Sequence, residues 1–188
     1  MTAPTTASPA RPLLRRWPTV AGLAFAAFVG FDSGGGADLA PVLAAAAVVY
    51  LGAAALGKHG AAWPLFFGTV VVITVTRLVD DRIEPTWLLF GAGAVLLVYG
   101  LLRGALRPVY GLPLQTLALL AYGAVAAVGL LLHPPLGAYL VALGLLGHAA
   151  WDLYHFRTSR VVSPSLAEFC LVLDATLAVV IVALTALG

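Results

Sequence analysis

Seven apolar runs of almost membrane-spanning length follow one another along this chain of 188 residues, and they constrain its fold more than any other feature. Each run approaches the roughly 17–25 residues that a helix needs to cross the hydrocarbon core of a bilayer. Backbone groups in lipid must be satisfied within their own segment, so the runs predict an all-α, polytopic bundle of seven transmembrane helices. The expected spans are Trp17–Phe31, Leu39–Leu56, Ala61–Val79, Thr86–Leu102, Leu112–Leu132, Pro135–His155 and Ser165–Leu187.

Composition supports a membrane protein and excludes several other classes. Hydrophobic residues make up 62% of the chain, against roughly 45–50% in soluble domains, and the mean hydropathy is +1.03. Cys170 is the only cysteine, so the chain can form neither an internal disulfide nor a metal site built from several cysteines. The only lysine, Lys58, falls in a predicted loop, which disfavours a retinal Schiff base. Basic residues are scattered singly, so no nucleic-acid partner is expected.

The distribution of charge between the runs predicts the topology. Residues 1–12 are rich in Pro, Thr and Ala and should form a disordered cytoplasmic tail before a single transmembrane domain, residues 13–188. The first run has the basic flank of a signal peptide, but we expect it to be retained as a span. With the N-terminus inside and the C-terminus outside a bacterial inner membrane, eight of the ten Lys and Arg residues are cytoplasmic. These eight are Arg11, Arg15, Arg16, Lys58, Arg103, Arg107, Arg157 and Arg160.

The sixth run carries an unusual set of ionisable residues. His148, Asp152 and His155 form the pattern His-x3-Asp-x2-His. On a helix they fall within about 60° of one another, so they share one stripe. Ionisable groups within apolar spans are costly and mark functional sites by default.

The seventh run brings two further acids to similar depth. In antiparallel neighbours, Glu168 lies roughly 4–5 Å inside the membrane and Asp174 roughly 13 Å inside. We therefore expect Asp152 to meet Glu168 and His148 to meet Asp174. Carboxylates that lie close together repel unless a cation or proton lies between them, and imidazole and carboxylate ligands suit zinc or iron. The predicted metal ligands are His148, Asp152 and His155, with Glu168 and Asp174 as catalytic bases toward water activated by the metal.

These residues favour a membrane-embedded, metal-dependent enzyme, hydrolase-like or lipid-modifying, with a site open toward the cytoplasm. Other polar residues of the same half are candidates for orienting ligands or substrate. Two alternatives remain open: a proton-coupled transporter or channel for small solutes or cations, and a scaffold subunit in which the same groups only pair structurally. The additional candidates are Tyr50, His59, Tyr99, Gln115 and Thr116.

The stretch from His148 to Asp174 resembles the C-terminal part of uncharacterised small multi-pass membrane proteins of high-GC bacteria. The matching elements are His-x2-Trp-Asp-x2-His, Val-Val-x-Pro and Glu-x-Cys-x3-Asp. The resemblance covers about a sixth of the chain and implies a multi-pass fold without a known activity. The arrangement is also distantly similar to alkaline ceramidases and adiponectin receptors, which use zinc. Those proteins have a His-x3-His pair in the last span, whereas Asp152 occupies the second position here, in span six, so zinc-amidase activity is not implied.

Overall fold

All the regular secondary structure in the described part of the chain is helical. A computed structural model describes residues 16–31 and 36–187. Within these residues every predicted apolar run is a helix, displaced by at most one residue except where α7 continues three residues beyond His155. The predicted tail, residues 1–12, lies outside the described residues. The elements are α2 (Trp17–Phe31), η1 (Gly36–Leu39), α3 (Ala40–Leu56), η2 (His59–Ala61), α4 (Ala62–Val79), α5 (Pro85–Leu102), α6 (Leu112–Leu131), α7 (Pro134–Thr158) and α8 (Pro164–Leu187).

Proline and residues with left-handed backbone conformations set several helix boundaries. Proline occupies the first turn of α3, α5, α6 and α7, where its missing N–H costs no helical hydrogen bond. Gly57 ends α3 with φ 63°, a conformation that glycine adopts without steric cost. Ser159 ends α7 with φ 50° and donates its N–H to the carbonyl of His155.

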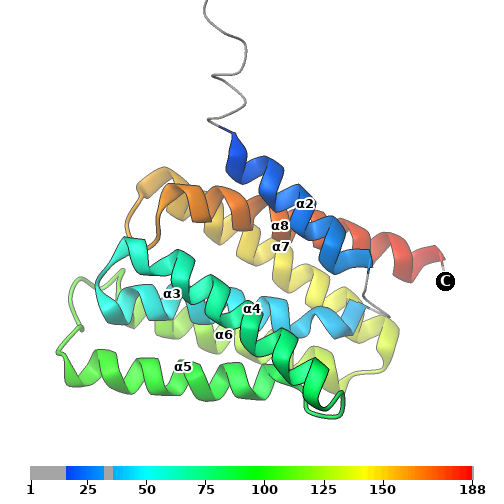
Figure 1. The fold of residues 1–188 in the computed structure, drawn as a ribbon, viewed down its shortest axis with the longest axis horizontal. Helices are drawn as coiled ribbons and strands as arrows, with labels where there is room; N and C mark the ends of the chain where they lie inside the picture. The colour runs from blue at the N-terminus through cyan, green and yellow to red at the C-terminus, as the bar shows by residue number, and fades with distance from the viewer. Residues whose placement is uncertain (1–15, 32–35, 188) are drawn as a thin grey trace, which may run out of the picture.

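The helices alternate in direction, so the connections gather at two opposite ends (Figure 1). Arg103 donates to the carbonyl of Leu56, which places the ends of α5 and α3 together. Arg160 lies over the ring of Tyr110, which joins the α7–α8 and α5–α6 connections at the same end. We call this end the basic end, and the opposite one the acidic end. The basic end carries Arg16, Lys58, Arg103, Arg107, Arg157 and Arg160; the acidic end carries Asp38, Asp80, Asp81 and Glu84, with Arg77 and Arg82.

Helix α3 forms the centre of the bundle. Thirteen of its seventeen residues are buried, and it packs against α4, α5, α6 and α7. The outer helices instead expose large apolar side chains, including Phe28 (74% exposed), Leu78 (80%) and Val95 (70%). Such a surface would be an aggregation liability in water but suits contact with lipid tails. By length and composition, six of the described helices, α3 to α8, can cross a membrane, which indicates a multi-pass membrane protein.

Helix α2 is shorter than these six but belongs to the same bundle. It has 15 residues and packs along α8. At Gly22 the two backbones approach so closely that an added Cβ would lie 2.7 Å from the carbonyl oxygen of Phe169. The absence of a side chain at Gly22 therefore permits the contact between α2 and α8.

We predict that Gly22→Ala lowers the free energy of unfolding by about 1–3 kcal/mol, because the methyl group forces α2 away from α8. Thermal unfolding in detergent would measure the loss. The matched control is Gly91→Ala, on the exposed face of α5, where an added Cβ meets nothing within 4 Å. Equal melting temperatures for the two variants would show that α2 is not packed as described.

Candidate functional site

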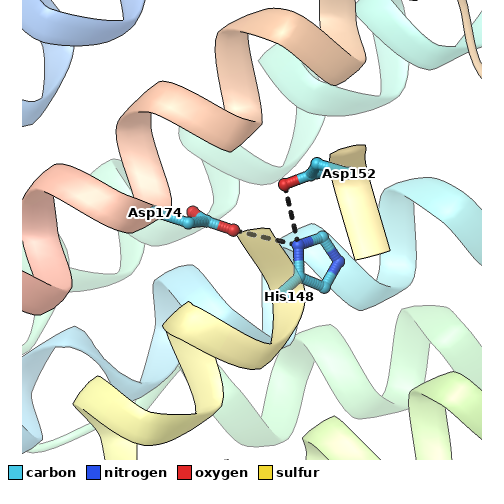
Figure 2. Close-up of side chains that lie close together, drawn as sticks. All are labelled: His148, Asp152 and Asp174. Carbon is cyan, nitrogen blue, oxygen red and sulfur yellow. Dashed lines mark hydrogen bonds and ion pairs between the residues drawn. The ribbon is translucent and has the colours of Figure 1, made fainter. Parts of the chain in front are cut away.

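The candidate site is a buried group of one histidine and two aspartates between α7 and α8. His148 and Asp152 lie one turn apart on α7, and Asp174 faces them from α8 (Figure 2). The Nδ1 atom of His148 lies 2.9 Å from Oδ2 of Asp174 and 3.3 Å from Oδ2 of Asp152. All three side chains are almost completely buried. The expected pairing of His148 with Asp174 is therefore confirmed.

The central helix contributes a fourth residue, Tyr50. Its hydroxyl donates a hydrogen bond of 2.6 Å to Oδ1 of Asp152, and its ring packs edge-on against the imidazole of His148. Tyr122 of α6 packs against the same imidazole with ring centroids 5.0 Å apart. The Nε2 atom of His148 is buried and has no hydrogen-bond partner among the described residues. The sequence marked Tyr50 as a candidate; Tyr122, a polar aromatic residue within the fifth apolar run, was missed.

The charges of this group do not balance by themselves. Even a protonated His148 supplies one positive charge against the two carboxylates of Asp152 and Asp174. Buried charges need compensation by a counter-ion or by protonation, because burial in an apolar interior is costly. The group therefore requires a further proton or a cation.

The three side chains form a group that can hold a metal ion. Each offers one ligand atom, and these atoms lie within 4.8 Å of one another. Ligands of a tetrahedral zinc ion with bonds of 2.0–2.2 Å lie roughly 3.3–3.6 Å apart, close to the separations at His148 Nδ1. One nitrogen and two oxygen ligands leave room for a fourth ligand, as in catalytic metal sites.

An apolar cavity of about 240 Å³ reaches this group. Asp174 belongs both to the metal-capable group and to the cavity wall, and Tyr50, which donates to Asp152, lines the same wall. The remaining wall comes from α2, η1, α3, α4 and α8 and is mostly aliphatic and aromatic. It also includes Arg77, at the acidic end of the bundle. The cavity thus connects the polar group with an apolar space large enough for part of a lipid-like molecule.

His155 was predicted as a metal ligand, but it lies outside the metal-capable group of His148, Asp152 and Asp174. It is only 1% exposed, and the rings of Tyr50 and Trp151 pack against its imidazole. Its Nε2 atom lies 3.2 Å from the amide nitrogen of Gln115, and its Nδ1 atom lies 3.0 Å from the carbonyl of Trp151. The indole N–H of Trp151 donates to the side-chain oxygen of Gln115. The three side chains form a polar layer nearer to the basic end than His148.

Glu168 contacts residues at the start of α2 and just before it, and not α7. It accepts a hydrogen bond from the hydroxyl of Thr19 and pairs with Arg16 at 3.3 Å. Asp152, its expected partner, contacts Tyr50 and His148. The structure therefore does not bring Glu168 into the metal-capable group.

The other candidates of the sequence analysis lie apart from this group. Tyr99 is 42% exposed and lies beside Arg103, whereas Thr116 donates to the backbone of its own helix. His59 belongs to η2 at the basic end.

Comparison with family models, with curated proteins and with solved structures finds no match for this chain. The interpretation of the site therefore depends on its geometry.

We predict that Tyr50→Phe destabilises the protein by about 1–3 kcal/mol, because it leaves a carboxylate oxygen of Asp152 buried without its donor. Tyr99→Phe, which removes an exposed hydroxyl, is the matched control. Thermal unfolding in detergent compares the two variants. A Tyr50→Phe variant as stable as Tyr99→Phe would contradict the described hydrogen bond.

Proposed function

We propose that this protein is a metal-dependent membrane enzyme that acts on a lipid or another apolar substrate. One observation carries the proposal. Asp174 of the metal-capable group also lines the apolar cavity, and so does Tyr50. A purely structural pairing of His148 with Asp174 would need no such space beside it. Ligand sites are typically apolar cavities with a few convergent polar groups, which is the arrangement found here.

His148, Asp152 and Asp174 would hold the divalent ion, with zinc and iron favoured by the nitrogen and oxygen ligands. When bound, such an ion supplies Lewis-acid activation of water or of a carbonyl or phosphoryl oxygen. Tyr50, fixed by its bond to Asp152, lines the cavity and would orient the polar part of the substrate. Asp174 also borders the cavity, so it would be placed to accept a proton there. Glu168 and His155, both outside the group, are assigned no direct role.

The cavity supports access from the bilayer and toward the acidic end, which differs from the cytoplasmic opening expected from the sequence. It follows α4 from Phe66 to Leu78, a length of about 18 Å at 1.5 Å per residue. Toward the basic end, α2 and α4 are joined by stacked aromatic rings of Trp17 and Trp63. An acyl chain could lie along the groove with its polar group near Asp174.

A proton-coupled transporter is the second candidate, and one observation favours it. Tyr50, Asp152, His148 and Asp174 form a continuous series of hydrogen-bonding groups within the apolar bundle. Series of this kind serve as proton relays in membrane proteins. Metal content distinguishes the two candidates, because a relay needs no bound ion.

We further propose that all seven helices span a bacterial inner membrane, with the basic end in the cytoplasm. The clustering of six described Lys and Arg residues at that end supports this orientation through the positive-inside rule. The N-terminus would then be cytoplasmic and the C-terminus external. Packing of α2 along α8 supports its retention as a span.

We predict about one equivalent of divalent metal in protein purified without chelators, measured by inductively coupled plasma mass spectrometry. His148→Ala and Asp174→Asn should each lower metal affinity at least tenfold, because the first removes one of three ligands and the second removes the negative charge of another. His133→Ala and Asp81→Asn remove the same residue types from exposed positions and should retain the metal. Mass spectrometry of a lipid extract incubated with the protein should detect a product that the ligand variants do not form.

Metal-free, folded wild-type protein would contradict the enzyme proposal. If that protein also catalysed a pH-dependent flux in vesicles that Asp174→Asn abolished, the relay would replace it. Loss of thermal stability alone in the ligand variants, with neither metal nor flux in the wild type, would leave only a structural role.

The topology predicts opposite labelling of two cysteine reporters in a Cys170→Ser background. Asp81→Cys should react with a membrane-impermeant maleimide from the periplasmic side of spheroplasts. Arg157→Cys should react only in inverted vesicles, because it lies at the opposite end of the bundle. The reverse pattern would invert the orientation, and labelling of both from one side would exclude the alternating topology.

A further inference from the structure

A second cavity, separate from the metal-capable group, lies at the basic end. Its volume is about 230 Å³, and its wall combines the end of α3 with η2, the α5–α6 connection and the α7–α8 connection. The side chains that give it its character are His59, Arg107, Tyr110 and Arg160. We call it the basic cavity. Its volume is close to that of the apolar cavity, but its wall carries polar and charged side chains, so it suits a small polar group.

The basic cavity has positive charge without a matching acid. Arg107 and Arg160 both line it, and none of the twelve residues that form its wall is Asp or Glu. Among the residues that the structure describes, neither arginine has a carboxylate partner. The positive-inside rule explains arginines at this end, but it does not explain why two from separate connections converge on one concave space.

Local contacts hold part of this positive wall in place. The guanidinium group of Arg160 lies 4.9 Å from the ring centre of Tyr110 and donates to the hydroxyl of Tyr154. An arginine has five N–H donors, so most of those on Arg160 remain for a ligand. The wall also includes Gly111 and Leu112 at the start of α6. The N–H groups of Gly111 and Leu114 there bond to the carbonyls of Pro108 and Val109, so the positive charge of the wall comes from the two arginines.

We propose that the basic cavity binds a phosphate-bearing anion. Arginine matches phosphate oxygens with paired, charge-assisted hydrogen bonds, which is the contact that Arg107 and Arg160 can offer from two sides. Two sources carry this chemistry: the headgroup of an anionic phospholipid in the adjacent leaflet, and a soluble phosphate. The site is independent of the proposed enzyme activity, since it shares no residue with the metal-capable group.

The test compares two double variants that remove the same charge from the same end. R107Q/R160Q replaces both arginines that line the basic cavity, whereas R103Q/R157Q replaces two arginines that do not line it. In one arm, calorimetry measures binding of inorganic phosphate to full-length protein in phosphatidylcholine nanodiscs. In the other, native mass spectrometry counts phosphatidylglycerol retained from mixed phosphatidylcholine and phosphatidylglycerol nanodiscs.

In at least one arm, R107Q/R160Q should lose binding about tenfold or more, while R103Q/R157Q changes it less than about twofold. Loss in the lipid arm alone identifies a headgroup, and loss in the phosphate arm identifies a soluble ligand. Arg107→Gln alone, which removes no hydrogen bond among the described residues, tests the site if the double variant does not fold. Equal losses in both double variants, or no binding in either arm, would overturn the proposal. Metal content should be unchanged throughout.

Discussion

Two aspartates share one imidazole at the centre of an apolar helix bundle, and the surrounding structure is arranged around the cost of burying them. Each carboxylate has lost its water and must be compensated by hydrogen bonds and positive charge. His148 supplies one shared nitrogen, and Tyr50 supplies a hydroxyl to Asp152. These donors come from two helices, so α3 and α7 must keep their relative depth and rotation for the acids to remain satisfied. The remaining negative charge makes a proton or a metal ion a necessary part of the group.

The alanine-rich sequence of α3 makes this arrangement possible. Small side chains let other helices approach α3 closely, which is how helices associate without a hydrophobic driving force between them. Gly144 of α7 packs beside Leu43, so the two helices meet near the level of the buried group. Tyr50 can then reach Asp152 across a short distance, and its ring fills space between His148 and His155. Toward the acidic end of α2 and α4, the apolar cavity lies between the helices.

The sequence predicted the helices and part of the site, for different physical reasons. Apolar runs bounded by Pro, Gly and charge determine helix ends, and antiparallel depth placed His148 beside Asp174. Depth alone could not place Glu168, because its partner Thr19 lies on a helix whose packing against α8 depends on Gly22. It could not place Tyr50 either, because α3 is apolar on all sides and its rotation has no periodic signal. His155 was predicted as a metal ligand because it shares a helix stripe with His148, but it contacts Gln115 of α6, a partner that the depth of residues on α7 and α8 does not reveal.

Stability by itself does not account for the buried group. Replacing buried ionic groups by apolar residues of similar volume is often neutral or stabilising, and α7 and α8 already pack through many apolar side chains. A bundle selected only for packing would gain little from an imidazole between two acids. It would gain less from leaving His148 Nε2 unpartnered and an apolar cavity open at Asp174. The chemistry of the group, whether it acts on an ion, a proton or a lipid, therefore explains its presence better than its contribution to folding does.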